Sequence, residues 1–398
     1  MSAPAALSEP FRCGCETIPA QAGLLSVDEA LLRALALAET VAGIERLPLE
    51  KAHGRVLGET VRAATPLPLF DNSAMDGYAI RLADLAGEGP WRLPVAGRVA
   101  AGDTGQTPVQ AGTIRLERRP EPGENIRRAG EDIVEGMELL PQGRRIDARA
   151  AALLAAAGCG EVAVRRRVRA AFFSTGSELR APGTPLAPGQ IWNANRYHLQ
   201  GSLGLPWLET IDMGAVPDRP GRLRAALEQA ASDADLVVTT GGVSVGDEDH
   251  MPAVLSAAGG EIHVMKVAMK PGKPLVVGRL GPALYLGLPG NPVSAFVSWH
   301  VIGARIAEAL AGIREAGPRR SIVRAGFERS RHPGRCEFLP ARLGEYDGHG
   351  TRSVEIVTSA VSHRVALLAQ ADGLLLIPSQ ADRIRRGDML EFLPFSDG

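Results

Sequence analysis

The chain has 398 residues, more than the roughly 100–200 of a single domain, so several domains are expected. Apolar residues make up 45% and charged residues 22%, which excludes a disordered chain. Aromatic residues are only 4%, so the core is expected to be aliphatic. The 44 basic and 45 acidic residues leave a net charge of -1. This balance argues against an extended basic surface, and we predict no nucleic-acid partner and only local anion sites.

The sequence also bears on the compartment. No apolar run approaches the ~18–20 residues that a membrane helix needs. The first residues, MSAPAALSEPFRCGCE, lack the basic start and apolar stretch of a signal peptide. Four scattered cysteines are too few for a disulfide framework. We therefore predict a cytoplasmic protein without a membrane partner, and a flexible tail over 1–23 that carries Cys13 and Cys15.

The first third of the chain predicts a helical part with an insertion. Ser26 and Glu29 form a capping box, which predicts that a helix over 26–41 begins there. Short β-type runs broken by Pro and Gly follow, and an alanine-rich helix is predicted over Ala148–Ala157. We expect three segments here: a helical linker domain over 24–67 and 147–167, interrupted by a β-rich lobe over 68–146.

From Val168 the pattern becomes an alternation of strands and helices. Strands separated by helices of about ten residues predict a doubly wound parallel sheet with helices on both faces, here over 168–316. A β-rich segment over 317–398 follows and has the size of a small barrel or sandwich. The fold class is thus multidomain α/β. The predicted strands are VRAAFFS, LETIDMG, DLVVTT, EIHVMKVA and ALYLGLPG, and the predicted helices are Asn193–Gly201, RPGRLRAALEQAA, DHMPAVLSAAG and Pro292–Ala311.

Three polar motifs follow strands of this predicted sheet. The loop Thr239–Asp247 contains Gly241 and Gly242, whose backbone N–H groups can turn inward to bind phosphate. The alternative is a tight turn without a ligand. Ser174–Glu178 and Gly287–Ser294 follow two other strands. Because ligands of such folds bind at the carboxyl ends of the strands, we expect one site there.

Lysine has an uneven distribution. Only four of the 44 basic residues are lysine, and Lys266, Lys270 and Lys273 lie within eight residues. Chance clustering in an arginine-rich chain is one explanation. The other is that these positions need compact ammonium groups, which suit a multiply charged anion.

Acidic residues near the predicted site also have two interpretations. Asp218, Asp247 and Asp249 together could hold Mg²⁺ through oxygen ligands, although each alone is an ordinary turn former. The segment Asp71–Ala79, DNSAMDGYA, has the composition of two Asx turns. It is polar enough that we also consider a substrate-facing loop from the β-rich lobe.

Five motifs together resemble a known family. DNSAMDGYA, PGENIRRAGED, TTGGVSVGDED, MKPGKP and GLPGNPVSA occur in the order and spacing of the MoeA / gephyrin E-domain family, the molybdopterin molybdenumtransferases. The resemblance spans residues 24–396. It implies a molybdopterin-binding α/β domain and insertion of molybdate into adenylylated molybdopterin in the presence of Mg²⁺, with release of AMP. It also implies a homodimer whose cleft uses the partner's β-rich regions, and molybdopterin adenylyltransferase as a pathway partner.

The resemblance also implies roles for individual residues. Lys270, Lys273 and Ser294 would contact molybdate, and Asp218 and Asp249 would hold the metal. The residues implied in catalysis are Asp76, Glu178, Asp218, Asp249, Lys266 and Lys270. Those implied in substrate binding are Thr240, Gly241, Gly242, Ser244, Gly246, Pro289, Pro292, Lys270, Lys273, Ser294 and Ser362.

The sequence departs from the family pattern in its β-rich regions. About 25 residues are missing after Ala111–Arg115, by comparison with the usual loop length, and with them a Thr that the family uses. Pro340 stands where an Arg is expected, and Ser362 lacks the preceding Gly. A non-catalytic carrier, scaffold or regulator is therefore the alternative. A single-domain adenylyltransferase also has a TTGG loop, but the VSVGD continuation and the extra lobes argue against it.

Overall fold

The computed structural model describes residues 24–102, 112–243, 250–314, 320–357 and 364–395. Two compact units are present. The first unit comprises the chain up to Val61, Leu140–Ala155 and the residues from Cys159 onward, and the second unit comprises Arg62–Leu139 and Ala156–Gly158. The predicted tail over 1–23 lies outside the described residues. The predicted domain boundaries stay predictions.

A six-stranded sheet forms the centre of the first unit. Its spatial order is β12-β9-β13-β17-β16-β14, and the first four strands are parallel. β13 and β17 are buried along their whole length, as expected for strands covered on both faces. The bounds are β9(Val168–Thr175), β12(Leu208–Val216), β13(Leu236–Thr240), β14(Glu261–Met265), β16(Val276–Leu280) and β17(Ala283–Leu288).

The prediction of an entirely parallel sheet was wrong in one place. Strand β16, which was not predicted, runs antiparallel to both β17 and β14. Only Gly281 and Pro282 separate β16 from β17, and Gly281 has φ +57°. Two residues suffice for a hairpin but not for a crossover to a parallel strand. Because β14 is antiparallel to β16, its carboxyl end still lies at the same edge as that of β17.

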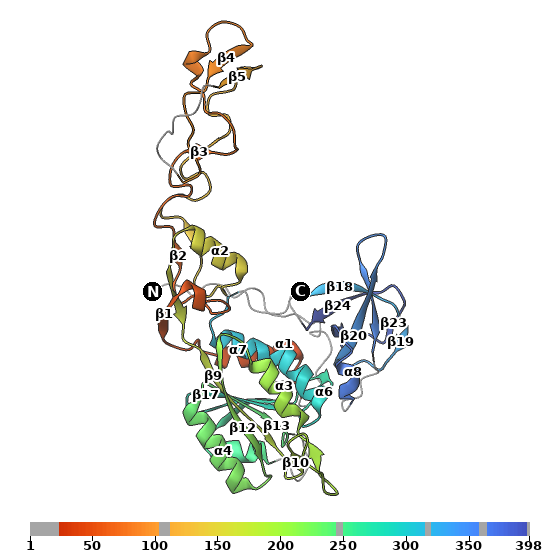
Figure 1. Cartoon of the computed structure of the whole chain (residues 1–398). Coiled ribbons are helices and arrows are strands. Elements are labelled where there is room, and N and C mark those ends of the chain that lie inside the picture. Colours follow the sequence, from red (N-terminus) through yellow and green to blue (C-terminus); the bar gives the residue numbers. More distant parts are fainter. Residues whose placement is uncertain (1–23, 103–111, 244–249, 315–319, 358–363, 396–398) are drawn as a thin grey trace. The chain divides into compact units, whose positions relative to one another are not determined.

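Helices cover both faces of the sheet (Figure 1). The apolar side chains of α1, α3, α6 and α7 pack with Ala170, Phe172 and Val238 on one face. Those of α4 and α5 pack with Ala171 and Phe173 on the other. Successive side chains of β9 point to opposite faces of the sheet and thus belong to two separate cores. The bounds are α1(Val27–Leu37), α3(Ala194–Leu203), α4(Pro220–Asp233), α5(Met251–Ala257), α6(Pro292–Ser298) and α7(Ala304–Leu310).

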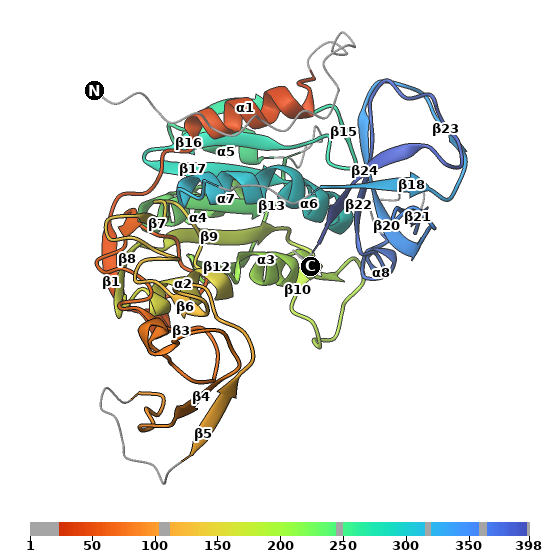
Figure 2. The ribbon, with the colours of Figure 1, turned by 90° about the horizontal axis from the view of Figure 1, so that it is seen from above.

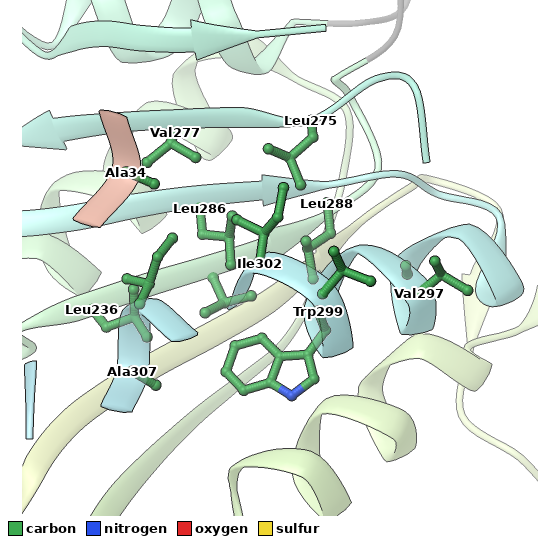
Figure 3. Packing of buried hydrophobic residues seen from close by; sticks show 14 of the residues in the cluster. Ala34, Leu236, Leu275, Val277, Leu286, Leu288, Val297, Trp299, Ile302 and Ala307 are labelled. Atoms are coloured by element: carbon green, nitrogen blue, oxygen red, sulfur yellow. The ribbon is translucent and has the colours of Figure 1, made fainter. Parts of the chain in front are cut away.

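The predicted helix Pro292–Ala311 contains an irregular turn. The π-helical turn η3(Trp299–Gly303) joins α6 to α7. Ile302, Leu286 and Leu288 are fully buried, and Figure 3 shows Ile302 pointing toward the strand residues. A Cβ at Gly303 would lie 2.5 Å from the Trp299 ring and 2.9 Å from Leu286. The turn therefore packs close to the sheet only because residue 303 lacks a side chain.

The last part of the chain forms a closed barrel, as predicted for 317–398. Five strands pair in the ring β20-β21-β18-β24-β22, and β22 pairs again with β20 to close it. Strand β15, from the lysine motif, is added to β20 in parallel (Figure 2). The bounds are β15(Met269–Lys270), β18(Ser321–Ala325), β19(Arg329–Ser330), β20(Cys336–Tyr346), β21(Arg352–Ile356), α8(Val365–Leu368), β22(Gly373–Ile377), β23(Arg383–Ile384) and β24(Met389–Pro394).

Shorter elements complete the two units. In the first unit, β1 pairs with β8 and β10 with β11. In the second unit, β3 pairs with β6 and β4 with β5, which agrees with a β-rich lobe. The bounds are β1(Ile44–Pro48), η1(Leu49–Lys51), β2(Val61–Arg62), β3(Asn72–Ser73), η2(Leu82–Asp84), β4(Trp91–Pro94), β5(Thr113–Leu116), β6(Ile126–Arg127), β7(Glu138–Leu140), α2(Ala148–Ala156), β8(Glu161–Arg165), β10(Leu179–Arg180) and β11(Ile191–Trp192).

Candidate functional site

Buried hydroxyl and amide groups connect the carboxyl ends of β9 and β13. The Thr240 hydroxyl donates to Ser174 Oγ at 3.0 Å, and Ser174 Oγ donates to Asn193 Oδ1 at 3.1 Å. Asn193 also caps α3, because its Oδ1 accepts from the backbone N–H of Arg196 at 3.1 Å. All three side chains of this chain of bonds are buried. The network fixes the end of the sheet on which the loops rest.

The predicted phosphate turn follows β13 directly. Gly241 and Gly242 have φ of +92° and +67°, which side chains other than glycine's rarely adopt. A Cβ at Gly241 would lie 2.7 Å from Thr175 Oγ1. The Cα of Gly241 is 3.5 Å from the ideal Cβ position of Gly290, so two strand-end loops approach each other. Ser244, Gly246, Asp247 and Asp249 lie outside the described residues.

The third strand-end loop begins α6. Pro292 is the first residue of that helix, where its missing N–H costs no hydrogen bond. Pro289 and Ser294 are buried, whereas Gly290 is exposed. The Asn195 side chain donates to the Gly290 carbonyl at 2.8 Å and so ties this loop to α3. The sequence prediction did not include Asn193 or Asn195 among the site residues, although both amides lie in the segment NAN at the start of α3.

Two predicted acidic residues lie at the ends of β9 and β12. The Asp218 carboxylate accepts from the Ser177 backbone N–H at 3.1 Å, and the Asp218 N–H donates to Ser177 Oγ at 3.2 Å. This reciprocal pair holds the two loops together. Glu178 is exposed beside it, and its backbone carbonyl accepts from Ile191. Asp218 and Glu178 therefore lie at the same edge as the glycine turn.

The three clustered lysines follow β14 at this edge. Lys266 has φ +64°, and a backbone bond of 2.9 Å from Val267 N–H to the Lys273 carbonyl closes the loop. Lys273 is exposed. Lys270 lies on β15, where its Nζ is 3.3 Å from Oε1 of Glu337 on β20. Sequence reasoning treated Lys270 as an anion ligand and did not predict its carboxylate partner, because 67 residues separate them.

The segment DNSAMDGYA lies in the second unit. The Asp71 carboxylate accepts from Ala129 N–H at 2.8 Å and from Arg128 at 2.5 Å. Both hydrogen bonds lower the pKa of Asp71, and the bond from Ala129 has the larger effect. Ser73 Oγ donates to the Met75 carbonyl at 2.6 Å. Asp76 is exposed. Asp71 thus shapes the loop that presents Asp76.

A cavity of about 670 Å³ lies away from the strand-end loops. Its walls come from α3, the α6–α7 helix and the region after Val365. Trp207, Phe296, Trp299 and Phe395 contribute aromatic rings to its lining. It contains no predicted site residue, so the candidate site is defined by the loops and lysines rather than by this cavity.

Among the described residues, no group of three or more His, Cys, Asp or Glu side chains is arranged to hold a metal ion. Asp218 is placed at the site edge, and its predicted co-ligand Asp249 and Ser362 of the C-terminal region are not among the described residues. The Gly241 N–H donates to the Leu288 carbonyl at 3.0 Å. Chemically, this end of the sheet combines a glycine turn with ammonium groups, and ammonium groups suit phosphate and oxyanion ligands.

Comparisons with protein families match the three parts of the chain in order. Residues 25–158 match the "MoeA N-terminal region (domain I and II)", residues 171–308 the "Probable molybdopterin binding domain" and residues 322–395 the "MoeA C-terminal region (domain IV)". A molybdopterin molybdenumtransferase of Haemophilus influenzae is 33% identical over 407 positions, which cover 94% of this chain and 99% of that protein. The chain belongs to the MoeA family.

A second relative and a solved structure of the MoeA family are also similar to this chain over most of its length. Molybdopterin molybdenumtransferase 2 of Mycobacterium tuberculosis is 35% identical, over 87% of this chain and 93% of its own length. A crystal structure of the molybdopterin biosynthesis MoeA protein from Pyrococcus horikosii superposes with a TM-score of 0.75 at 28% identity, covering 94% of this chain and all of that one. The 407 positions aligned with the H. influenzae protein exceed 94% of 398 residues, so that relative has residues without a counterpart here.

Proposed function

We propose that this protein is a molybdopterin molybdenumtransferase, which inserts molybdate into adenylylated molybdopterin and releases AMP. The observation that carries the proposal is that the Gly241–Gly242 turn after β13 and the lysine loop after β14 lie at the same end of the sheet in a MoeA-family chain. The relatives named above as molybdopterin molybdenumtransferases support it.

Different residues are proposed to bind different parts of the substrates. The Gly241 N–H is already bonded to the Leu288 carbonyl, so we assign phosphate to the backbone of the turn from Gly242 onward. Pro289, Pro292 and Ser294 shape the adjoining wall. Lys270 and Lys273 bind molybdate, a tetrahedral dianion, through compact ammonium groups. Lys266, Glu178 and Asp218 lie at the same edge and complete the described part of the site.

We include Mg²⁺ in the proposal. Asp218 offers the hard carboxylate oxygens that this ion prefers, with Asp249 as the proposed second ligand. When bound, the ion supplies positive charge to the phosphate bridge that is cleaved. Replacing Asp218 by Asn is expected to weaken Mg²⁺ binding measured by calorimetry.

One observation favours the non-catalytic alternative. Pro340 is buried in the β20–β22 ladder opposite Leu374, at the position where the family resemblance implies an arginine. A proline supplies no cation there. A protein that binds molybdopterin or molybdate as a carrier, scaffold or regulator would tolerate that loss. We favour the transferase because all three clustered lysines are retained.

Turnover decides between these two functions. Purified protein is mixed with adenylylated molybdopterin, molybdate and Mg²⁺, and the released AMP is measured by chromatography. The transferase releases AMP in proportion to the molybdate supplied. Pterin binding without AMP release would instead establish the carrier.

We further propose a homodimer, in which the exposed DNSAMDGYA loop of one chain completes the lysine site of the other. Leu69, Phe70, Met75 and Tyr78 are each more than 60% exposed in and before this loop, which supports burial against a second copy. Sedimentation showing a monomer at micromolar concentration would contradict the dimer.

A cytoplasmic location and molybdopterin adenylyltransferase as pathway partner are proposed from the family resemblance. Among the described helices, none is long and apolar enough to cross a membrane.

A further inference from the structure

A buried carboxylate lies beside the lysine loop. Glu337 of β20 is 3% exposed. Its Oε1 is 3.3 Å from Lys270 Nζ and 3.7 Å from Arg331 Nε, and its Oε2 is 2.9 Å from Arg329 Nη2. Burying a carboxylate is unfavourable unless cations compensate it, and here three cations surround one carboxylate.

Backbone pairing holds this carboxylate in register with the lysine. Strand β15 pairs with β20 so that Lys270 lies opposite Glu337 and Met269 opposite Cys336. The Cys336 N–H also donates to the Ala268 carbonyl at 2.9 Å. Met269 and Cys336 are fully buried. The barrel therefore contributes a strand edge and a carboxylate to the loop that carries the lysines.

The three cations differ in their exposure. The Arg331 side chain is 5% exposed, and it also donates to the carbonyls of Pro378 and Arg335. The Arg329 side chain is 18% exposed, whereas that of Lys270 is 38% exposed. An ammonium has three N–H donors. One N–H donor of Lys270 is directed to Glu337, so two N–H donors can bind an anion that approaches from solvent.

We propose that Glu337 is a positioning residue for the oxyanion site: it fixes the ammonium of Lys270 so that the remaining donors meet molybdate. Arg329 and Arg331 lie within ion-pair distance of the same carboxylate and compensate its burial. This inference rests on the proposed function, since it takes molybdate as the anion. It adds a residue of the barrel to the site.

Charge alone and positioning predict opposite results when Glu337 is replaced by Gln. The cluster of one carboxylate and three cations has a surplus of two positive charges, and the substitution raises the surplus to three. If only the electrostatic potential matters, molybdate binds more tightly. If Glu337 positions Lys270, molybdate binds more weakly, because the ammonium loses its anchor and turns away from the two arginines.

The experiment measures molybdate binding by equilibrium dialysis and AMP release against molybdate concentration. We expect Glu337→Gln to raise the dissociation constant and the half-saturating molybdate concentration by about tenfold, since weakening one hydrogen bond to a charged group costs about that factor in binding. Glu337→Asp, which keeps the charge one methylene shorter, should recover part of the loss. Glu391→Gln is the matched control, because Glu391 pairs with Arg320 of the barrel rather than with Lys270.

A double-mutant cycle excludes a merely structural effect. In the Lys270→Ala background, Glu337→Gln should change molybdate binding no further, whereas in the Lys273→Ala background it should retain its full effect. Unchanged or tighter binding by Glu337→Gln would overturn the positioning role, as would additivity with Lys270→Ala. If Glu337→Gln does not fold, the same criteria apply to Glu337→Asp. A wild-type protein that neither binds molybdate nor releases AMP would instead refute the proposed function.

Discussion

At the scale of single residues, Lys273 offers the clearest test of the oxyanion site. Its side chain is exposed, so a substitution there has little effect on stability. Lys273→Arg keeps the charge but replaces a compact ammonium by a wide planar guanidinium. We expect it to fold normally, to keep pterin binding and to lose molybdate-dependent AMP release almost as fully as Lys273→Ala.

The measurement is the AMP release rate over a range of molybdate concentrations, with unfolding curves as the control for folding. Raised molybdate should restore the Arg variant only in part, because geometry as well as affinity is changed. Wild-type rates in Lys273→Arg at low molybdate would show that the lysine cluster is an accident of composition.

His198 makes the stability of the first unit depend on pH. Burial, with His300 as a second cause, lowers the pKa of His198 to about 4 from its ordinary 6.5. Above pH 6.5 the side chain is neutral in both the folded and the unfolded state. Between pH 6.5 and 4 the unfolded state binds a proton that the folded state does not. Folding therefore loses up to about 3 kcal/mol as the pH falls through this window.

The check is urea unfolding at several pH values. His198→Leu should flatten the decline in the free energy of unfolding between pH 6.5 and 4, whereas His332→Gln, at an exposed position, should leave the decline as in the wild type. An equally steep decline in both variants would rule out His198 as its source.

Sequence patterns identified residues whose chemistry is local. Gly241 and Gly242 were predicted to form a turn because the two glycines are adjacent, and both have a positive φ, which glycine readily adopts. Glu337 was not predicted as part of the site. Its significance depends on a strand pairing across 67 residues, and nothing in the run CEFLP marks that partner.

At the scale of elements, the closing helix depends on a small residue in its π-helical turn. We expect Gly303→Ala to destabilise the protein by about 1–3 kcal/mol, because its Cβ would overlap Trp299 and Leu286 and overpack the core. Gly201→Ala is the matched control. Gly201 also lies in a helix, but a Cβ there meets nothing within 4 Å, so it should be neutral or stabilise by about 0.5–1 kcal/mol.

Thermal unfolding of the two variants gives the comparison. A similar midpoint for Gly303→Ala and Gly201→Ala would contradict the close packing of η3 against the sheet. The variants leave the strand-end loops unaltered, so residual AMP release should follow the fraction of folded protein.

Elements with strong local signals were predicted well. The capping box placed the start of α1, and the Ser26 hydroxyl accepts from Glu29 N–H at 3.1 Å. Strand β16 was missed because its run follows the lysine motif without a helix between them. The two-residue β15 carries no periodic signal and exists only through its pairing with the barrel.

At the scale of the whole molecule, the second unit is an insertion whose two ends meet. Within this unit, Ala63 N–H donates to the Met137 carbonyl at 2.9 Å and Gly136 N–H to the Ala63 carbonyl at 2.8 Å. The three main apolar clusters contain no residue of 62–139. We expect a chain in which a short glycine linker replaces 64–136 to fold but to release no AMP.

Asp76→Asn in the intact chain is the companion variant, and it should lose AMP release without a change in unfolding midpoint. Wild-type turnover after excision of 64–136 would show that the lobe has no part in the reaction. Circular dichroism and the AMP assay on both proteins provide the measurements.

The pairing of β15 with β20 has a consequence for biosynthesis on the ribosome. The chain emerges in order, so the α/β sheet is complete after Leu288, well before Cys336 and Glu337 exist. A product cut short between these points would have a finished sheet and all its lysines, but Lys270 would have neither its strand partner nor its carboxylate. Premature termination would thus yield a protein that folds in part but lacks the strand pairing and the carboxylate that hold Lys270.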